Sequence, residues 1–361
     1  MQLVPAETCR AQIVAVLTAW GMEPETVRVT AEVMVETDLS GVDSHGISML
    51  MDYDESRRKG RLNLHARPRV LRESPVTALV DADAGLGHPA SVMAMELAIA
   101  KAEVAGVGVV AVRNSHHFGA AGHYARMAPR RGLVGLVTSA TRTVGVVPTR
   151  AAVPVLGTNP IAFAAPAGRN LPFCLDMATS TVAANKVRVY GLQGKALPPG
   201  WVLDGEGRPV TDANAAWDVI KARPEGGLTP VGGTAEMGSH KGYGLGMMAH
   251  ILGGVLSGAS FSPIRNRTQR PEDPDDLGHF FMALDPGAFR EEGEFEADLD
   301  AAIDVLHATP PADPALPVLV PGEPEAASRE RRLRAGIPIP ASLAQQLREV
   351  CARAGVPCLL G

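Results

Sequence analysis

Between residues 76 and 138 the sequence alternates between short apolar runs rich in β-branched residues and longer segments with helical spacing. Three of the runs are predicted strands, at 76–80, 107–112 and 134–138. The segments 90–105 and 121–130 between them are predicted helices. A chain that alternates in this way folds into βαβ units, in which helices cover the faces of a sheet. The sequence therefore predicts an α/β fold.

The N-terminal part has a different pattern, with helices only. Residues 6–20 and 24–38 carry apolar residues at helical spacing, and a glycine follows each run. A third helix is predicted over residues 44–59, with Ser44 as its N-cap. We therefore expect a helical unit before the sheet begins.

Beyond residue 138 the pattern is less regular. Three further strands are predicted, at 161–165, 171–177 and 279–284. Residues 178–239 read as a polar stretch rich in loops, 241–259 as a buried helix and 266–277 as a charged loop that contains proline. From about residue 286 the chain reads as helix and loop. A stretch rich in proline and glutamate, 310–325, would return the chain to the N-terminal helices.

The length and composition limit the class of protein. The 361 residues, 46% of them hydrophobic, exceed the size at which one core usually stops growing. A net charge of -5 and an aromatic content of 4% argue against nucleic-acid binding. The four cysteines show no CxxC spacing, the N-terminus lacks a signal-peptide pattern, and the most apolar helix is too short to span a bilayer. These features predict a cytoplasmic protein with reduced thiols and no membrane contact.

A glycine-rich segment at residues 85–90, GLGHPA, follows a strand and opens a helix. It matches the motif whose backbone amides bind the pyrophosphate of dinucleotides in the Rossmann fold. That motif requires an acidic residue at the end of the next strand, and this strand ends in Arg113 and Asn114. Pro89 also removes an amide donor from the motif. We therefore interpret the segment as a glycine turn with a proline in the first helical turn.

His45 is the first candidate for proton transfer. It follows Ser44 at the predicted helix start, where the helix dipole would lower the pKa of the imidazole. Such a histidine can exchange a proton with a substrate oxygen near neutral pH. The alternative is a histidine that only begins a surface helix.

His116 and His117 follow the predicted strand 107–112, and open α/β sheets bind ligands at the carboxyl ends of their strands. Because adjacent side chains of an extended backbone point apart, we expect at most one of them to be catalytic. The chain could instead hold a metal through four nitrogen ligands, from His45, His116 or His117, His123 and His279. It has no HExxH motif, so a zinc hydrolase is the alternative and a site without metal the favoured reading.

Polar residues at three further turns suit the polar groups of a cofactor. The turn 157–160 precedes a strand, 176–180 ends one, and Lys241 adds charge to the free amides at the start of the predicted buried helix. Each feature could equally be a well-capped turn or a solvated lysine.

Taken together, these segments resemble the malate/L-lactate dehydrogenase family. The resemblance rests on seven segments, in the family's order over residues 39–286: GVDSHGIS, VRNSHHFGAAGHYA, GTNPIAFAAP, LDMATSTVAANKV, LPPGWVLD with VTDANAA after it, HKGYGLGMMAHILGGVLSGA and GHFFMALDP. The relatives include ureidoglycolate, sulfolactate, diketogulonate and cyclic-imine carboxylate oxidoreductases. Each segment is a weak signal, and their joint occurrence is specific.

The resemblance implies a non-Rossmann α/β fold of the L-sulfolactate/malate dehydrogenase type. A helical unit built from both termini, residues 1–75 and 287–361, would pack on a mixed-sheet cofactor-binding domain formed by 76–286. The resemblance also implies a homodimer with the site near the subunit interface. It implies NAD or NADP as cofactor, and the sequence does not distinguish the two.

The resemblance also implies roles for individual residues. His45 matches the proton donor and Ser44 its neighbour in the substrate pocket. His116 falls where some members carry the catalytic histidine, and His117 where others carry a pocket histidine. The positions that match cofactor contacts are Asn159, Asp176, Met177, Ala178, Lys241, Gly242, Gly322 and Glu323.

One position departs from the family pattern. Many members carry an arginine four residues after the histidine of the helix start, where it binds the substrate carboxylate, and this chain has Met49. If a helix begins near Ser44, His45 and Met49 share a face, so Met49 would form an apolar wall of the pocket. We expect Arg142, in the loop after a strand, to bind the carboxylate instead.

The sequence thus predicts an NAD(P)-dependent oxidoreductase that transfers hydride between nicotinamide and a small 2-oxo or 2-hydroxy acid, or a related cyclic imino acid. The alternatives are the metal hydrolase and a non-catalytic nucleotide-binding module.

Overall fold

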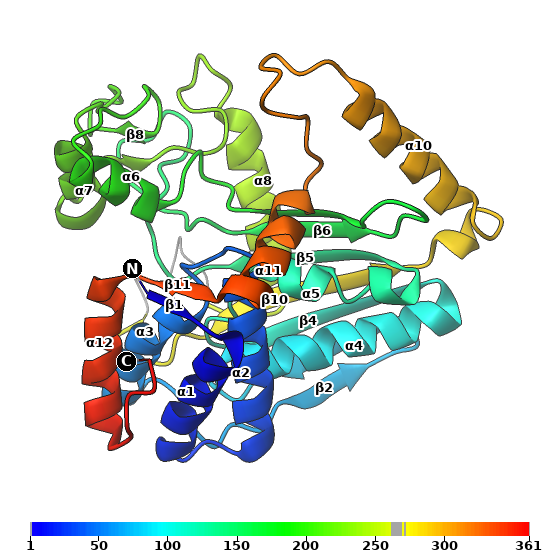
Figure 1. Ribbon diagram of the computed structural model, residues 1–361, viewed down its shortest axis with the longest axis horizontal. Coiled ribbons are helices and arrows are strands. Elements are labelled where there is room, and N and C mark those ends of the chain that lie inside the picture. Colours follow the sequence, from blue (N-terminus) through cyan, green and yellow to red (C-terminus); the bar gives the residue numbers. More distant parts are fainter. Residues whose placement is uncertain (1, 261–268, 271, 361) are drawn as a thin grey trace.

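The computed structural model describes residues 2–260, 269–270 and 272–360, and its centre is a mixed sheet of seven strands (Figure 1). The strands lie in the order β2-β3-β4-β10-β5-β6-β7. Their bounds are β2 Arg69–Glu73, β3 Thr77–Asp81, β4 Val107–Ser115, β5 Val134–Ala140, β6 Ile161–Ala165, β7 Phe173–Met177 and β10 Leu277–Leu284. Only β3 and β4 run parallel, and all other neighbours are antiparallel. The predicted α/β fold is confirmed.

The parallel pair β3 and β4 is joined by helix α4 (Gly87–Ala105), as the alternating pattern predicted. Gly106 ends the helix in a left-handed conformation, with φ of 81°, which glycine adopts at no steric cost. The helix contains ten buried residues, and its alanines let it lie close to β4. Within this unit the strand β4 carries His116 and His117 just beyond its end.

Helices cover both faces of the sheet. Helices α4 and α5 (Ala121–Ala125) contact β4, β5, β6 and β10, and they enclose the larger core with Tyr124 and Phe281. Helix α8 (His240–His250) and the π-helical turn η3 (Ile251–Val255) cover the opposite face, where they contact β4, β5 and β10. The layer formed by α4 and α5 brings the residues after β4 next to the helical unit.

Both termini build the helical unit. It contains α1 (Ala6–Ala19), α2 (Pro24–Leu39), α3 (Leu50–Arg58) and α12 (Ala341–Ala354), with a two-stranded sheet of β1 (Gln2–Val4) and β11 (Ile337–Ile339). A second apolar core, with Leu17, Leu50, Tyr53 and Leu347, holds these elements together. Helix α11 (Glu323–Ala335) packs on α2, and α2 in turn packs on α4 (Figure 1). The predicted helical unit on a mixed sheet is therefore confirmed.

Residues 178–239, expected to be polar and rich in loops, also contain helices and strands that were not predicted. This stretch contains α6 (Ala184–Leu192) and α7 (Ala213–Ala222), together with a small sheet of β8 (Val202–Leu203) and β9 (Gly227–Leu228). A third core, with Val187, Val202, Val219 and Leu228, lies between them. The two helices are short, so packing on this core contributes most of their stability.

Two boundaries differ from the sequence-based expectation. Strand β2 pairs with β3, so the sheet begins at Arg69, inside the segment expected to be wholly helical. Its five residues are all exposed and show no apolar alternation. After the sheet, α10 (Glu294–Ala308) does not lie on the helical unit, because Asp300 accepts hydrogen bonds from the backbone amides of Arg169 and Asn170. The chain returns to the helical unit only from α11 onward.

The predicted buried helix is buried on one side only. Ala249 and four of its glycines are buried, and Gly253 lies against the sheet. Five apolar side chains between 38% and 58% exposed lie on its other side: Leu245, Met248, Ile251, Val255 and Leu256. Among the described residues no helix has the length and apolar character needed to cross a membrane. Of the predicted loop 266–277, residues 266–268 and 271 lie outside the described part.

The glycine motif is a packing device, as predicted. Its Gly87 donates a backbone hydrogen bond to the carbonyl of His117, and a Cβ there would lie 2.5 Å from the carbonyl oxygen of His116. A Cβ on Gly85 would similarly lie 2.4 Å from Ala66. The turn is filled by protein, which leaves no place for a pyrophosphate and is consistent with the non-Rossmann fold.

Candidate active site

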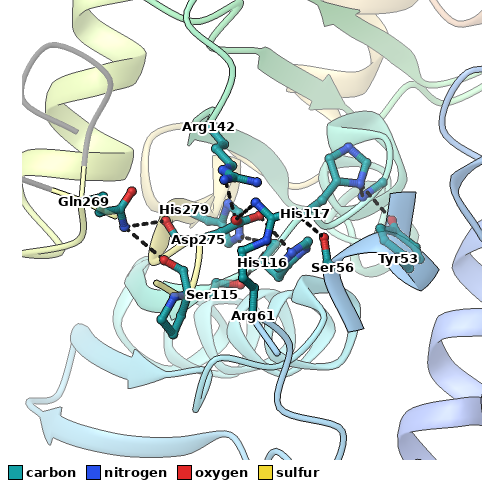
Figure 2. A network of polar contacts seen from close by, with 12 residues as sticks. Tyr53, Ser56, Arg61, Ser115, His116, His117, Arg142, Gln269, Asp275 and His279 are labelled. Carbon is teal, nitrogen blue, oxygen red and sulfur yellow. Dashed lines mark hydrogen bonds and ion pairs between the residues drawn. The ribbon is translucent and has the colours of Figure 1, made fainter. Parts of the chain in front are cut away.

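Four segments that are distant in the sequence meet beyond the end of β4 (Figure 2). They are the turn at His45 with helix α3, residues 115–117 after β4, the loop after β5 with Arg142, and the loop before β10 with Asp275. Figure 2 shows the side chains of the last three segments directed toward one another around Asp275.

His45 precedes the helix instead of beginning it. The helical conformation starts with a 3-10 turn, η1 (Ile47–Met49), and α3 follows. Ser44 makes no cap, and its hydroxyl lies 2.7 Å from Nδ1 of His45. The predicted N-cap was therefore wrong. The pKa of His45 is lowered, as predicted, but the cause is burial and not the helix dipole.

The turn that carries His45 is held in place by Asp38 of α2. The carboxylate of Asp38 accepts a hydrogen bond of 2.8 Å from the backbone amide of Ile47. Burial raises the pKa of this carboxyl to about 7. Gly46 makes the contact possible, because a Cβ there would lie 1.9 Å from Oδ1 of Asp38. The position of His45 thus depends on a glycine and an acid that the sequence did not single out.

His117 lies against His45. The centroids of the two rings are 5.3 Å apart, and Nδ1 of His117 lies 2.8 Å from the hydroxyl of Tyr53 on α3. Burial and the neighbouring histidines lower the pKa of His117 well below its usual range, so its ring is neutral. Tyr53 is fully buried and was not predicted as a site residue. It holds the ring of His117 beside His45.

His116 points to a different partner. Its Nε2 lies 2.8 Å from Oδ2 of Asp275, and His116 is 4% exposed. Oδ1 of Asp275 lies 3.0 Å from Nε of Arg142, the residue expected to bind a substrate carboxylate. The structure thus brings Arg142 and His116 together through an acid of the charged loop, a residue that the sequence pattern does not single out (Figure 2).

Met49 closes the 3-10 turn, and its backbone amide donates to the carbonyl of Gly46. The expectation that His45 and Met49 share one face of a helix was wrong, because His45 lies outside the helix. Met49 is partly exposed and packs against the core of the helical unit. A contact between Met49 and the substrate stays a prediction.

Two of the expected cofactor residues, Asp176 and Gly322, line a cavity of about 270 Å³. Residues of β7, Cys174 and Asp176, face the turn before α11, where Gly322 has a φ of 105° and a Cβ would lie 3.1 Å from Cys174. The backbone amide of Cys174 donates to the carbonyl of Pro321. Asp176 is exposed, and its carboxylate accepts from the backbone amide of Gly122. The turn can therefore approach β7 closely only because residue 322 is glycine.

Glu323 does not line this cavity. Its carboxylate accepts hydrogen bonds from the backbone amide of Val320 and lies 2.7 Å from Nε2 of His307. The acidic side chains that line the cavity are Asp176 and Glu325. Glu323 thus stabilises the turn that presents Gly322.

Asn159 is fully buried and bridges two elements. Its Oδ1 accepts from the backbone amide of Thr141, and its Nδ2 donates to the carbonyl of Gly246 in α8. The side chain therefore holds the loop of Arg142 against α8, and any effect of Asn159 on a ligand would act through that loop.

The remaining expected cofactor residues lie near these elements. Met177 and Ala178 end β7 and are partly exposed, while the backbone of Thr179 donates to the carbonyl of Thr158. Lys241 is exposed in the first turn of α8. Gly242 packs against Val231, where a Cβ would lie 2.2 Å from the backbone nitrogen. The structure thus places Lys241 on an exposed helix start, which suits an anion.

No cluster of three or more metal-ligating side chains occurs in the part of the chain that the structure describes. The histidines of the site contact a tyrosine, a serine, an aspartate and each other. The arrangement offers groups that bind an anion and exchange a proton, which is the chemistry of a dehydrogenase site and does not favour the hydrolase.

The comparisons with known proteins identify the family of this chain. Residues 4–348 match the family model described as malate/L-lactate dehydrogenase. The chain is 39% identical to a malate dehydrogenase of Pyrococcus horikoshii, over 98% of this chain and 96% of that one. It is 34% identical to an L-sulfolactate dehydrogenase of Methanocaldococcus jannaschii, over 98% of each. The crystal structure of a malate dehydrogenase from Entamoeba histolytica superimposes with a TM-score of 0.91 at 31% identity, over 99% of each chain.

The family resemblance that the seven sequence segments indicated is thus confirmed over nearly the whole chain. The relatives are dehydrogenases of hydroxy acids, and their lengths match that of this chain. This chain belongs to the malate/L-lactate dehydrogenase family, and it is an oxidoreductase that acts on the CH–OH group of hydroxy acids.

Proposed function

We propose that this protein interconverts a small 2-oxo acid and the corresponding 2-hydroxy acid with NAD or NADP. The observation that carries the proposal is a pair of groups beyond the end of β4: the partly exposed His45, whose ring lies 5.3 Å from that of His117, and the guanidinium of Arg142, which lies beside Asp275. Such groups can bind the carboxylate of a substrate and exchange a proton with the oxygen on the adjacent carbon atom.

The cofactor would be held between the sheet and α11. Asp176, Met177 and Ala178 end β7, Gly322 closes the 270 Å³ cavity, and Lys241 offers a positive charge at the start of α8. The exposed carboxylate of Asp176 and the open main chain of the Gly322 turn suit the polar groups of a dinucleotide. When bound, the nicotinamide supplies or accepts the hydride.

His45 would hold the proton that the reaction needs. In the reducing direction its imidazolium donates a proton to the substrate oxygen, and in the oxidising direction the neutral ring removes it. Burial lowers the pKa of His45, so the neutral form prevails at neutral pH. The hydroxyl of Ser44, 2.7 Å from Nδ1, orients the ring and leaves Nε2 for the substrate.

Arg142 would bind the carboxylate of the substrate. Its side chain is 36% exposed, and its Nε lies next to Asp275. The guanidinium has five donors in a planar fork, so the groups beyond Nε can form a bidentate pair with a carboxylate. This role replaces that of the family arginine, whose position is occupied by Met49 here.

We further propose that two copies of the chain form a homodimer. The apolar residues that α8 and η3 leave uncovered, among them Ile251 and Leu256, form a contiguous face on the same helix that begins with Lys241. Burial of this face against a second copy would remove it from water and bring the subunit interface close to the cofactor cavity.

The proposed function is tested with a panel of acids and both cofactors. We expect pyruvate or another 2-oxo acid to be reduced with oxidation of NADH or NADPH, measured by the loss of absorbance of the reduced nicotinamide. The metal chelator EDTA should leave the rate unchanged. If no 2-oxo or 2-hydroxy acid and no cyclic imino acid in the panel is turned over with either cofactor, the proposed function is wrong.

Met49→Arg is expected to shift the substrate preference toward dicarboxylates. The wild type should have a higher kcat/KM for lactate than for malate, because Met49 offers an apolar wall and no charge. An arginine there would add a charge-assisted pair with the second carboxylate, so the malate-to-lactate ratio should rise about tenfold or more.

The matched control is Met49→Leu, which keeps an apolar side chain and should leave the ratio near that of the wild type. Efficient malate turnover by the wild type, or an equal ratio in all three proteins, would show that Met49 lies outside the substrate pocket.

A further inference from the structure

Asp275 is a buried carboxylate in a loop that the sequence marks only as charged. Its side chain is 5% exposed, and three basic groups surround it: Nε2 of His116 at 2.8 Å, Nε of Arg142 at 3.0 Å and a terminal guanidinium nitrogen of Arg61 at 3.8 Å. A carboxylate is removed from water at a high cost unless charged partners compensate for the loss of hydration. The three basic groups provide that compensation (Figure 2).

The charges of this cluster do not balance. Arg61 and Arg142 each carry one positive charge and Asp275 carries one negative charge, so these three side chains together have an excess of one positive charge. Arg61 is 7% exposed and cannot reach a ligand, whereas Arg142 is 36% exposed. The excess charge is therefore accessible at Arg142 only, where a carboxylate could neutralise it.

Asp276, the residue after Asp275, connects this loop to the end of β4. The carboxylate of Asp276 accepts hydrogen bonds from the backbone amides of Asn114 and Ser260. Asn114 and Asp276 both have positive φ, of 49° and 47°, a strained conformation that this contact stabilises. Asp275 is thereby held beside the residue pair His116 and His117.

We propose that Asp275 is a positioning residue that fixes the guanidinium of Arg142 and the imidazole of His116, and so sets the binding site for the substrate carboxylate. Oδ1 of Asp275 forms an ion pair with Nε of Arg142, which leaves the outer edge of the fork facing away from Asp275. Its other oxygen lies 2.8 Å from Nε2 of His116, which makes no hydrogen bond within the described residues. The proposal rests on the proposed function, because Asp275 would orient the 2-oxo or 2-hydroxy acid that is the substrate of that reaction.

Asp275→Asn is expected to raise the KM for pyruvate, or for the best 2-oxo acid of the panel, about tenfold. The kcat should fall less, because His45 remains in place, and the Kd of NADH or NADPH should change less than twofold. Asn keeps the shape of the side chain and loses its charge, so Arg142 is no longer held. The matched control is Asp273→Asn, an acid of the same loop whose carboxylate contacts Arg270.

A double-mutant cycle separates positioning from a general structural role. If Asp275 acts through Arg142, Asp275→Asn should raise KM less than twofold when introduced into Arg142→Ala. Asp275→Glu, which retains the charge, should lose less affinity for the acid than Asp275→Asn does. It is the second variant to be measured if Asp275→Asn unfolds below the assay temperature.

Additive effects of the two substitutions on KM would overturn the proposal, as would an unchanged KM in Asp275→Asn. A KM for Asp275→Glu that is as high as that of Asp275→Asn would overturn it too, because packing and not charge would then decide. These results are distinct from a failure of the proposed function, in which the wild type itself turns over no member of the panel.

Discussion

His45→Ala is expected to lower kcat by about a hundredfold or more, with the Kd of the cofactor nearly unchanged. The size of the loss follows from the usual contribution of a positioned general acid or base. His45 lies in the turn before α3, while the expected cofactor contacts lie on β7, α8 and the turn before α11, so binding and proton transfer should separate. Stopped-flow or steady-state turnover, together with fluorescence titration of the cofactor, measures both quantities.

The pH dependence gives a second measurement of the same role. Burial lowers the pKa of His45 from the ordinary value of 6.5. Oxidation requires the neutral ring, so its rate should stay constant from pH 8 down to the usual histidine range and fall only below it. Reduction requires the imidazolium, so its rate should rise as the pH falls through the same range.

The matched control is His65→Ala, which removes an exposed histidine of the loop after α3 and should leave kcat and both pH profiles unchanged. If His45→Ala retains full turnover with its pH profile intact, the proton is held by another group, and His117, 5.3 Å away, is the first to be tested.

Gly46→Ala is expected to lower kcat by about a hundredfold and to lower Tm. A Cβ at this position would lie 1.9 Å from Oδ1 and 2.4 Å from Oδ2 of Asp38, whose carboxylate is buried and held by the amide of Ile47. Overpacking of this kind costs about 1–3 kcal/mol of stability. A displacement of about 1 Å in the turn would move His45 out of reach of the substrate, a loss of about a hundredfold.

The control for this substitution is Gly145→Ala, at a glycine where a Cβ would meet no atom within 4 Å. It should leave kcat and Tm unchanged. Thermal unfolding and steady-state turnover of the two variants decide the question. Wild-type values for Gly46→Ala would mean that the turn tolerates a side chain and that Asp38 does not fix His45.

Local sequence patterns determined most of the fold. Helices α1 and α2 were predicted within one residue of their ends, because apolar spacing and the glycines after them are local signals. The βαβ unit around α4 was predicted for the same reason. The rejection of the glycine motif as a pyrophosphate site was also a local inference, from the missing acid and from Pro89.

Elements without a local signal were missed. Strand β2 is wholly exposed and forms because β3 offers an unpaired edge. Helices α6 and α7 form on a core that includes residues as distant as Val146 and Leu228. Helix α6 carries little apolar periodicity of its own. Helix α7 does carry local signals that were not used: apolar residues at helical spacing and Asp212 as its N-cap, whose side chain accepts from the amide of Ala215.

For the site, the local sequence showed which residue types lie at strand ends and turns. This information was enough to indicate His45, His116, His117 and Arg142. The tertiary structure alone decided their partners. Tyr53 contacts a histidine 64 residues away, and Asp275 contacts one 159 residues away. Such contacts cannot be predicted from the local sequence. They arise only when helices and strands pack and bring together the end of β4, the Arg142 loop and the Asp275 loop.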